Sequence, residues 1–408
     1  MDYEQSGRQI KMEERKFRAV VSFVDSLEEK KQIPGCSIQI VQHGKCVLTH
    51  CTGLADVEKQ RKVEKDTLFR IFSMTKLITC TCAMQLYEQG RFDLNEPLYL
   101  YLPEYKKIKV FSEIEPDCKA VEEAKNPILI KDLFRMSAGF TYGGSGLPTE
   151  KQTQELLDRL DKSILQDEEE IQPMTTREVI MELSKIPLAF EPGTHWRYGM
   201  SHDVLGALIE EISGMKLEDY MQRFIFDPLD MKETGFYWEE KELEQRLAKV
   251  YSTKSGKREE VKEADWYYRK GKNRYASGGS GLLSTLRDYM KFANTMALGG
   301  TNQDGVRLLG RKTLELMRMD HLSKEMKADY NWAHQAAYSY GLGCRTMVYP
   351  QKGGCNSSYG EFGWSGKAGS LVFIDPAEEL AVVYMQQMMP SLEDYVMPRL
   401  RSVIYGCL

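Results

Sequence analysis

The feature that most constrains the fold of this chain is the placement of strand-like segments at both ends of the sequence. Residues 36–53, CSIQIVQHGKCVLTHCTG, alternate apolar and polar side chains around a His-Gly-Lys turn, a pattern that predicts a β-hairpin. Three more strand-like segments lie near the C-terminus, at 338–349, 369–376 and 380–388. Strands at both ends with helices between them favour one antiparallel sheet assembled from the two termini.

Helical patterns dominate the rest of the chain. Residues 10–31 place apolar side chains at helical spacing ahead of a Pro-Gly break, and residues 95–265 are predicted to be mostly helical. A final helix is expected at about 391–405. The predicted fold class is therefore α+β: an antiparallel sheet formed by the N- and C-terminal segments, flanked by helices, with an inserted, mostly helical domain.

The same patterns predict how the chain divides into domains. We assign residues 12–62 together with 276–408 to the sheet domain, and residues 63–275 to the helical domain. The active site is expected between them.

Composition excludes several classes of function. The chain has 408 residues, 42% hydrophobic and 28% charged, with a net charge of −5. Charges of both signs are interspersed, which predicts no nucleic-acid partner and no anionic membrane surface. No segment approaches the roughly 18 consecutive apolar residues of a membrane span. The polar N-terminus lacks the apolar run of a signal peptide, so a cytoplasmic location is expected; the sequence carries no signal for oligomeric state.

Cysteine and histidine usage indicates neither a disulfide framework nor a metal site. The nine cysteines follow no framework spacing and include no C-x-x-C pair, which favours free thiols in a reducing compartment. The six histidines form no H-E-x-x-H or H-x-H cluster. There is also no Walker motif and no G-x-S-x-G serine elbow. We predict no metal and no cofactor.

Two S-x-x-K matches compete as a catalytic pair. Ser73 lies where a strand-like TLFRIF gives way to a helix, so its backbone N–H is near the positive end of the helix dipole, and Lys76 projects from the same face one turn later. A desolvated lysine can take the proton of a serine hydroxyl. Ser213 instead ends a helical segment and is followed by the capping Gly214, so its partner Lys216 is coincidental. Ser73 is the candidate nucleophile.

The surroundings of Ser73 resemble a known superfamily. Six stretches occur in the order expected for the serine β-lactamases and penicillin-binding proteins, and within that superfamily they are most similar to class C-like enzymes and the family VIII carboxylesterases. The resemblance covers roughly residues 12–405. The stretches are IPGCSIQIVQHGK, DTLFRIFSMTK, ILIKDLFRMSAGFTYG, FEPGTHWRYGMSHDVLGALIEEISG, YASGGSGLLSTLRDYMKFAN and FGWSGKAGSLVFIDP.

The resemblance implies roles for two further motifs. The second motif, a tyrosine that faces the nucleophile, falls on Tyr198, which would act as general base or proton relay. Met200 stands where the lactamases carry an asparagine, so a hydrogen-bond donor to a substrate amide is missing. Either Lys76 or Tyr198 could be the base that activates Ser73.

The third motif falls on Trp364-Ser365-Gly366, where many lactamases carry a cationic lysine. Gly366 would allow substrate to approach the strand closely, and the N–H of Lys367 would complete an oxyanion hole with that of Ser73. Trp364 could alternatively be a core aromatic beside a turn. Lys367 or Arg345 could offer a cation to a substrate carboxylate.

The leading functional hypothesis is a serine hydrolase that forms an acyl-enzyme on Ser73 and acts on small or short-acyl esters, with a small-molecule ester or amide as its partner. An acyltransferase to an alcohol acceptor remains open, because no motif separates it from a hydrolase. A β-lactamase or D,D-peptidase is disfavoured by the missing polar contacts. A non-catalytic scaffold or sensor is the alternative from a different class.

Overall fold

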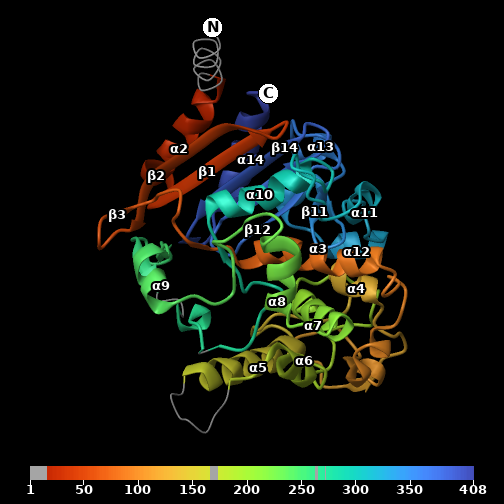
Figure 1. The fold of residues 1–408 in the computed structure, drawn as a ribbon. Helices are drawn as coiled ribbons and strands as arrows, with labels where there is room; N and C mark the ends of the chain where they lie inside the picture. Colours follow the sequence, from red (N-terminus) through yellow and green to blue (C-terminus); the bar gives the residue numbers. More distant parts are fainter. Residues whose placement is uncertain (1–15, 166–172, 262–264, 272) are drawn as a thin grey trace.

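The computed structural model describes residues 16–165, 173–261, 265–271 and 273–408. Within them, an eight-stranded antiparallel sheet has the strand order β10-β11-β12-β13-β14-β1-β2-β3, so that the two ends of the chain pair at β1 and β14 (Figure 1). This confirms the predicted α+β class. The strands are β1 (Gly35–Gln42), β2 (Lys45–Asp56), β3 (Arg61–Lys62), β10 (Tyr338–Tyr340), β11 (Arg345–Met347), β12 (Phe362–Ser365), β13 (Leu371–Asp375) and β14 (Leu380–Gln386).

The N-terminal hairpin forms where the alternating pattern predicts it. β1 and β2 are joined at His43 and Gly44, whose φ angles of 51° and 70° are both positive. Positive φ at both central residues is the geometry of the turn type that matches strand twist in two-residue hairpins. The register shifts between Ile40 and Val41, which marks a bulge in the pair.

Helices cover both faces of the sheet. α10 (Leu286–Ala297) packs on β1, β13 and β14, while α2 (Arg18–Lys31) packs on β2 and against α14 (Glu393–Tyr405) (Figure 1). All seven residues of β14 are buried, as expected for a central strand covered on each side. The final helix begins at residue 393, close to the predicted start at about 391. Residues 10–15 of the predicted first helix lie outside the described residues.

Helices are the main regular elements of the region between the terminal strands, which lies below the sheet in Figure 1, but long loops hold more of its residues than the predicted, mostly helical pattern implied. Its helices are α3 (Thr75–Glu88), α4 (Ile130–Phe134), α5 (Pro148–Leu165), α6 (Thr176–Leu183), α7 (Ser201–Ser213), α8 (Leu217–Met221) and α9 (Glu240–Arg246). Short strand pairs interrupt it: β4 (Phe69–Arg70) with β9 (Leu283–Ser284), β5 (Lys109–Phe111) with β6 (Val121–Glu123), and β7 (Val250–Ser252) with both β8 (Glu259–Val261) and β15 (Met388–Met389). The C-terminal part adds α11 (Arg311–Met317), α12 (Lys324–Asp329) and α13 (Pro350–Gly353).

Helix α3 is the element that positions the site. Its side chains are buried on almost every face, as expected for a helix enclosed on all sides, and it packs against α7. The turn that precedes α3 contacts β12 of the sheet. The start of α3 therefore lies where the helical region meets the sheet. The boundaries predicted for the two domains stay a prediction.

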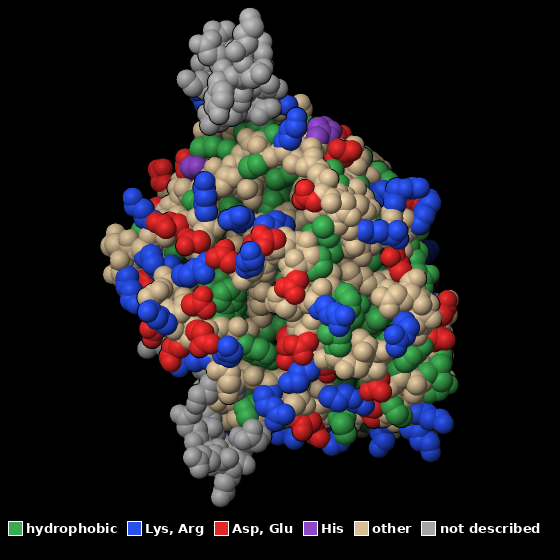
Figure 2. Space-filling view, in the orientation of Figure 1, with side chains coloured by type: hydrophobic (Ala, Val, Ile, Leu, Met, Phe, Trp, Pro, Cys, Tyr) green, Lys and Arg blue, Asp and Glu red, His purple; other side chains and the backbone are tan. Residues whose placement is uncertain are grey.

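The visible surface agrees with the charge pattern of the sequence. Figure 2 shows Lys and Arg side chains interspersed with Asp and Glu, without a large patch of one sign on this face. Across the described ranges, no helix has both the length and the apolar composition needed to cross a membrane.

Candidate active site

Ser73 lies in a strained turn between a strand and a helix. Strand β4 ends at Arg70, a single 3₁₀ turn covers Phe72–Met74, and α3 begins at Thr75. Phe72 has a φ of 43°, a left-handed value that non-glycine residues rarely adopt and that clusters at functional sites. This turn leaves Ser73 partly exposed, although both of its neighbours in the chain are buried.

Lys76 brings a buried amine to the Ser73 hydroxyl. Its Nζ lies 3.1 Å from Ser73 Oγ, 2.7 Å from Tyr142 Oη and 2.6 Å from the Gly279 carbonyl oxygen. The side chain is fully buried, and the loss of hydration lowers the pKa of Lys76 from 10.5 to about 7. A neutral amine can donate to Gly279 and Tyr142 while its lone pair accepts the Ser73 proton, which is the arrangement of a general base.

Asp203 holds the loop against which Lys76 rests. Its carboxylate, 1% exposed, accepts hydrogen bonds from Tyr275 Oη at 2.6 Å, Ser277 Oγ at 2.5 Å and Gly279 N at 3.2 Å. The carbonyl of the same Gly279 faces Lys76. Burial is the main cause of the lowered Lys76 pKa, and the negative charge of Asp203 opposes it. Asp203 thus orients and tunes Lys76 without touching Ser73.

Tyr198 faces Ser73 from the segment that precedes α7. Its hydroxyl is hydrogen-bonded to Ser73 and accepts the indole N–H of Trp364 at 2.9 Å. Burial raises the pKa of Tyr198 above its ordinary value, and the contact with Ser73 and the hydrogen bond from Trp364 only partly offset this. The tyrosine therefore remains a neutral phenol over the physiological pH range, whereas half of Lys76 is already deprotonated at about pH 7.

The 364–367 segment lies beside the Ser73 turn. A Cβ on Gly366 would come within 2.6 Å of the Ile71 carbonyl oxygen, so glycine is required here because β12 approaches the chain's own backbone. The sequence had suggested a different reason, the approach of substrate. Lys367 follows with an exposed side chain whose Nζ lies 5.9 Å from the centre of the Phe72 ring. The oxyanion-hole role expected of its backbone N–H stays a prediction.

Two polar residues near β12 are engaged within the fold. Ser365 donates its hydroxyl to Glu393 Oε1 at 2.5 Å. Arg345, with no exposed surface, lies 3.4 Å from the same carboxylate and 3.3 Å from Ser365 Oγ. The expectation that Arg345 could turn toward a substrate carboxylate is therefore wrong, because its departure would leave the Glu393 carboxylate without this cationic partner.

Two cavities adjoin the catalytic cluster. The first chamber, of about 320 Å³, is lined by Phe72, Met200 and Lys367 together with side chains of α5. The second chamber, of about 470 Å³, is lined by Tyr198, Trp196 and Trp332 among others. Tyr142 lines both chambers. Met200 is 1% exposed. It gives the first chamber an apolar wall at the position where the lactamases carry an asparagine.

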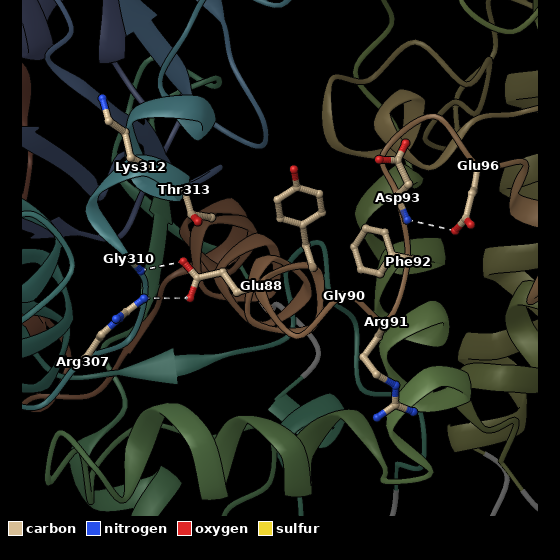
Figure 3. A pocket seen from close by; sticks show the side chains of 11 residues that line it. Glu88, Gly90, Arg91, Phe92, Asp93, Glu96, Arg307, Gly310, Lys312 and Thr313 are labelled. Carbon is tan, nitrogen blue, oxygen red and sulfur yellow. Dashed lines mark hydrogen bonds and ion pairs between the residues drawn. The ribbon is translucent and has the colours of Figure 1, made fainter.

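A third cavity, of about 720 Å³, is larger but lies away from this chemistry. Figure 3 shows it around Glu88, which contacts Arg307 and the backbone of Gly310. It adjoins the C-terminal end of α3, whereas Ser73 and Lys76 are at the N-terminal end. None of the predicted catalytic residues lines it.

The structure brings together Ser73, Lys76, Tyr198 and Trp364 as the sequence predicted, and it adds Tyr142 and Asp203. Both added residues fall inside stretches that carry the family resemblance. Their roles depend on contacts across the fold, which sequence spacing does not reveal. Ser213 ends α7, with Gly214 as its left-handed cap, which confirms it as a helix terminus. Among the described side chains, no group of three or more His, Cys, Asp or Glu is arranged to hold a metal ion.

A large antiparallel sheet joined at strands from both ends of the chain, with many helices around it, is the fold class of the β-lactamases and transpeptidases. The chain belongs to the Beta-lactamase family, whose sequence profile matches residues 20–403.

Known relatives support this placement. Protein Rv1367c of Mycobacterium tuberculosis is 28% identical over 88% of this chain and 87% of its own length. Lovastatin esterase of Penicillium rubens is 29% identical over 74% of this chain and 71% of its own. The solved structure of EstCE1, described as a hydrolase with promiscuous acyltransferase activity, aligns with a TM-score of 0.80 at 22% identity, covering 97% of this chain and all of that one. The relatives of this chain thus include a named esterase, and its fold is similar to that of a hydrolase described as having acyltransferase activity.

Proposed function

We propose that this protein is a carboxylesterase that hydrolyses small or short-acyl esters through an acyl-enzyme on Ser73. The observation that carries the proposal is the buried amine of Lys76, 3.1 Å from Ser73 Oγ, with its pKa lowered to about 7. A base with a pKa near the working pH combines a sufficient neutral population with a useful driving force for proton transfer.

The reaction would proceed in two balanced halves. Lys76 takes the Ser73 proton as Oγ attacks the ester carbonyl, and the backbone N–H groups of Ser73 and Lys367 receive the negative charge on the carbonyl oxygen. The ester C–O bond then breaks, Tyr198 gives its proton to the departing alkoxide, and Lys76 returns a proton to Tyr198. In the second half a water loses a proton to the same relay, attacks the acyl carbon and releases the acid with Ser73 reprotonated.

The arrangement of Tyr198 favours this division of labour. As a neutral phenol it holds a proton to give to a leaving oxygen, and Trp364 orients its hydroxyl. We therefore propose Lys76, rather than Tyr198, as the base that activates Ser73. Without a cationic residue at position 364, the site has little means of making Tyr198 a phenolate.

The test is covalent labelling followed by mass measurement. A fluorophosphonate or an activated ester should add one adduct to the wild type, mapped by peptide analysis to Ser73, and none to Ser73→Ala. Ser213→Ala is the matched control, since Ser213 is the other S-x-x-K serine and is the last residue of α7; it should label like the wild type. Labelling of folded Ser73→Ala at the wild-type rate would overturn the proposal.

An acyltransferase is the second candidate, because EstCE1 is described as having that activity and a 470 Å³ chamber adjoins Tyr198. In this case an alcohol would replace water in the second half-reaction. Product analysis in the presence of added alcohol separates the two. A β-lactamase or D,D-peptidase is less well supported, since Met200 is apolar and Arg345 is held by Glu393; nothing in the site favours a scaffold or sensor.

We further propose a cytoplasmic location and a small-molecule substrate, with no nucleic-acid or membrane partner. The nine cysteines are all free thiols in the structure, which suits a reducing compartment. Both chambers that adjoin the catalytic cluster have the size of small-molecule sites.

A further inference from the structure

The two chambers that adjoin the catalytic cluster differ in chemistry, and Tyr142 lines both of them. The rings of Tyr142 and Tyr198 lie with their centres 5.5 Å apart. Tyr198 lines the second chamber but not the first. Because Tyr198 would donate the proton to the leaving oxygen, the alcohol part of an ester must lie on its side. The second chamber is therefore the place of the alcohol, and the first receives the acyl group.

The second chamber has an aromatic wall. Trp332 is 36% exposed, and its ring centre lies 5.4 Å from that of Trp196 and 6.1 Å from that of Tyr198. An exposed indole face offers contact area to a flat apolar surface such as the C–H face of a saturated ring. The wall lies next to the ring of Tyr198, so a ring bound there would be held near the residue that protonates the leaving oxygen.

The charged side chains of the second chamber are already paired. Glu150 binds Arg197 and accepts the backbone N–H of Gly146 and of Leu147, each at 3.0 Å. The carboxylate of Asp329 accepts the backbone N–H of Trp196 at 3.0 Å and lies at the same distance from His195 Nδ1.

The two carboxylates and one guanidinium that line the chamber sum to a net charge of −1, and each already has a partner. A cation would meet Arg197, and a carboxylate would meet Glu150 and Asp329. A neutral group with several hydroxyls fits better, because each hydroxyl both donates and accepts. The exposed Asn331, whose amide also does both, lines the same chamber. The volume of about 470 Å³ holds roughly fifteen water-sized groups of about 30 Å³ each, which is room for one hexose ring.

We propose that the alcohol part of the ester is a neutral, polyhydroxylated ring, such as a sugar or cyclitol, that lies against Trp332 and bonds Asn331, Arg197 and Asp329. The proposal rests on the esterase function above. The bond that breaks joins the acyl carbon to a ring-borne oxygen. That oxygen takes the Tyr198 proton and leaves as a free hydroxyl, while the acyl group stays on Ser73 until water removes it.

The experiment compares three acetate esters that share one acyl group. They are 6-O-acetylglucose, cyclohexylmethyl acetate, which has a similar shape without hydroxyls, and vinyl acetate, whose leaving group is too small to fill the second chamber. We expect kcat/KM for the sugar ester to exceed that for cyclohexylmethyl acetate at least tenfold. Acetylcholine, a cationic ester with the same acyl group, should be poorer than the sugar ester.

Two variants then test the lining of the second chamber directly. Trp332→Ala and Asn331→Ala should each lower the ratio of sugar-ester to vinyl-acetate kcat/KM about tenfold. Asn331 is an exposed position whose substitution leaves the core intact. The matched control is Tyr359→Ala, an aromatic residue that is 70% exposed and lines neither chamber; its ratio should equal that of the wild type.

The outcomes separate this inference from the proposed function. Turnover of vinyl acetate with no advantage of the sugar ester over cyclohexylmethyl acetate overturns the inference and leaves the esterase intact. A preference for acetylcholine, or ratios unchanged in both chamber variants, does the same. Failure of the wild type to turn over vinyl acetate or to acquire an acyl adduct instead removes the esterase itself.

Discussion

The acidic limb of the pH–rate profile should report the ionisation of Lys76. With an ordinary pKa of 10.5 only about 0.03% of this lysine would be neutral at pH 7, whereas a pKa of about 7 makes half of it neutral. Burial thus increases the population of active base about a thousandfold. Because protonated Lys76 cannot accept the Ser73 proton, kcat/KM should fall tenfold for each pH unit below 7. At pH 5 it should be about 100-fold below its plateau.

The assay is kcat/KM for a neutral ester from pH 5 to 9, with circular dichroism at each pH to verify that the fold persists. His334, whose Nε2 lies 3.9 Å from Glu393, provides the histidine control: His334→Gln should retain the acidic limb. Measuring the pKa of the limb at several temperatures also distinguishes a lysine from a histidine, since an amine has a larger ionisation enthalpy than an imidazole. A flat profile between pH 5 and 8, or a limb above pH 9, would refute Lys76 as the base.

Four further predictions follow from the cluster. Ser73→Ala should abolish ester turnover with little change in melting temperature, while Ser213→Ala should keep activity within a few fold; wild-type turnover by folded Ser73→Ala would exclude the nucleophile. Tyr198→Phe should lower kcat/KM by about two to four decades, and a nearly silent variant would assign the relay elsewhere. Asp203→Asn should shift the acidic limb to lower pH, because its charge raises the Lys76 pKa; a purely structural role would lower the rate without moving the limb. A p-nitrophenyl butyrate-type ester should give a higher kcat/KM than a chromogenic cephalosporin on the same preparation, and the reverse order would contradict the ester assignment.

The sequence predicts the fold well because its strongest patterns are local. The alternation in residues 36–53 and the apolar segments near the C-terminus each mark a strand, and a sheet that joins both ends follows from their positions. The short strands β5 to β8 were missed. They are three residues each, too short for a period-2 pattern to stand out from the polar loops around them.

The sequence predicts the site only as far as its motifs extend. Ser73 and Lys76 are found because they are one helical turn apart, a spacing that geometry fixes. Tyr142 and Asp203 meet Lys76 from segments 66 and 127 positions farther along the chain, and no local pattern encodes such a meeting. The role of the buried Asp203 carboxylate in holding a loop becomes apparent only from its three hydrogen-bond donors in the folded structure.

Trp364 illustrates how a substitution can change the role of its partner. From the sequence, tryptophan in place of a lysine appeared only as a lost charge. In the structure its indole N–H donates to Tyr198, a bond that a phenol oxygen accepts while keeping its own proton. A lysine at that position would instead favour the phenolate, because a nearby cation lowers the pKa of an acid. In the proposed mechanism the exchange makes Tyr198 the proton donor and leaves deprotonation to Lys76, whose burial provides the neutral amine. An alkoxide leaving group needs such a donor, and this requirement connects the aromatic residue at 364 with ester cleavage.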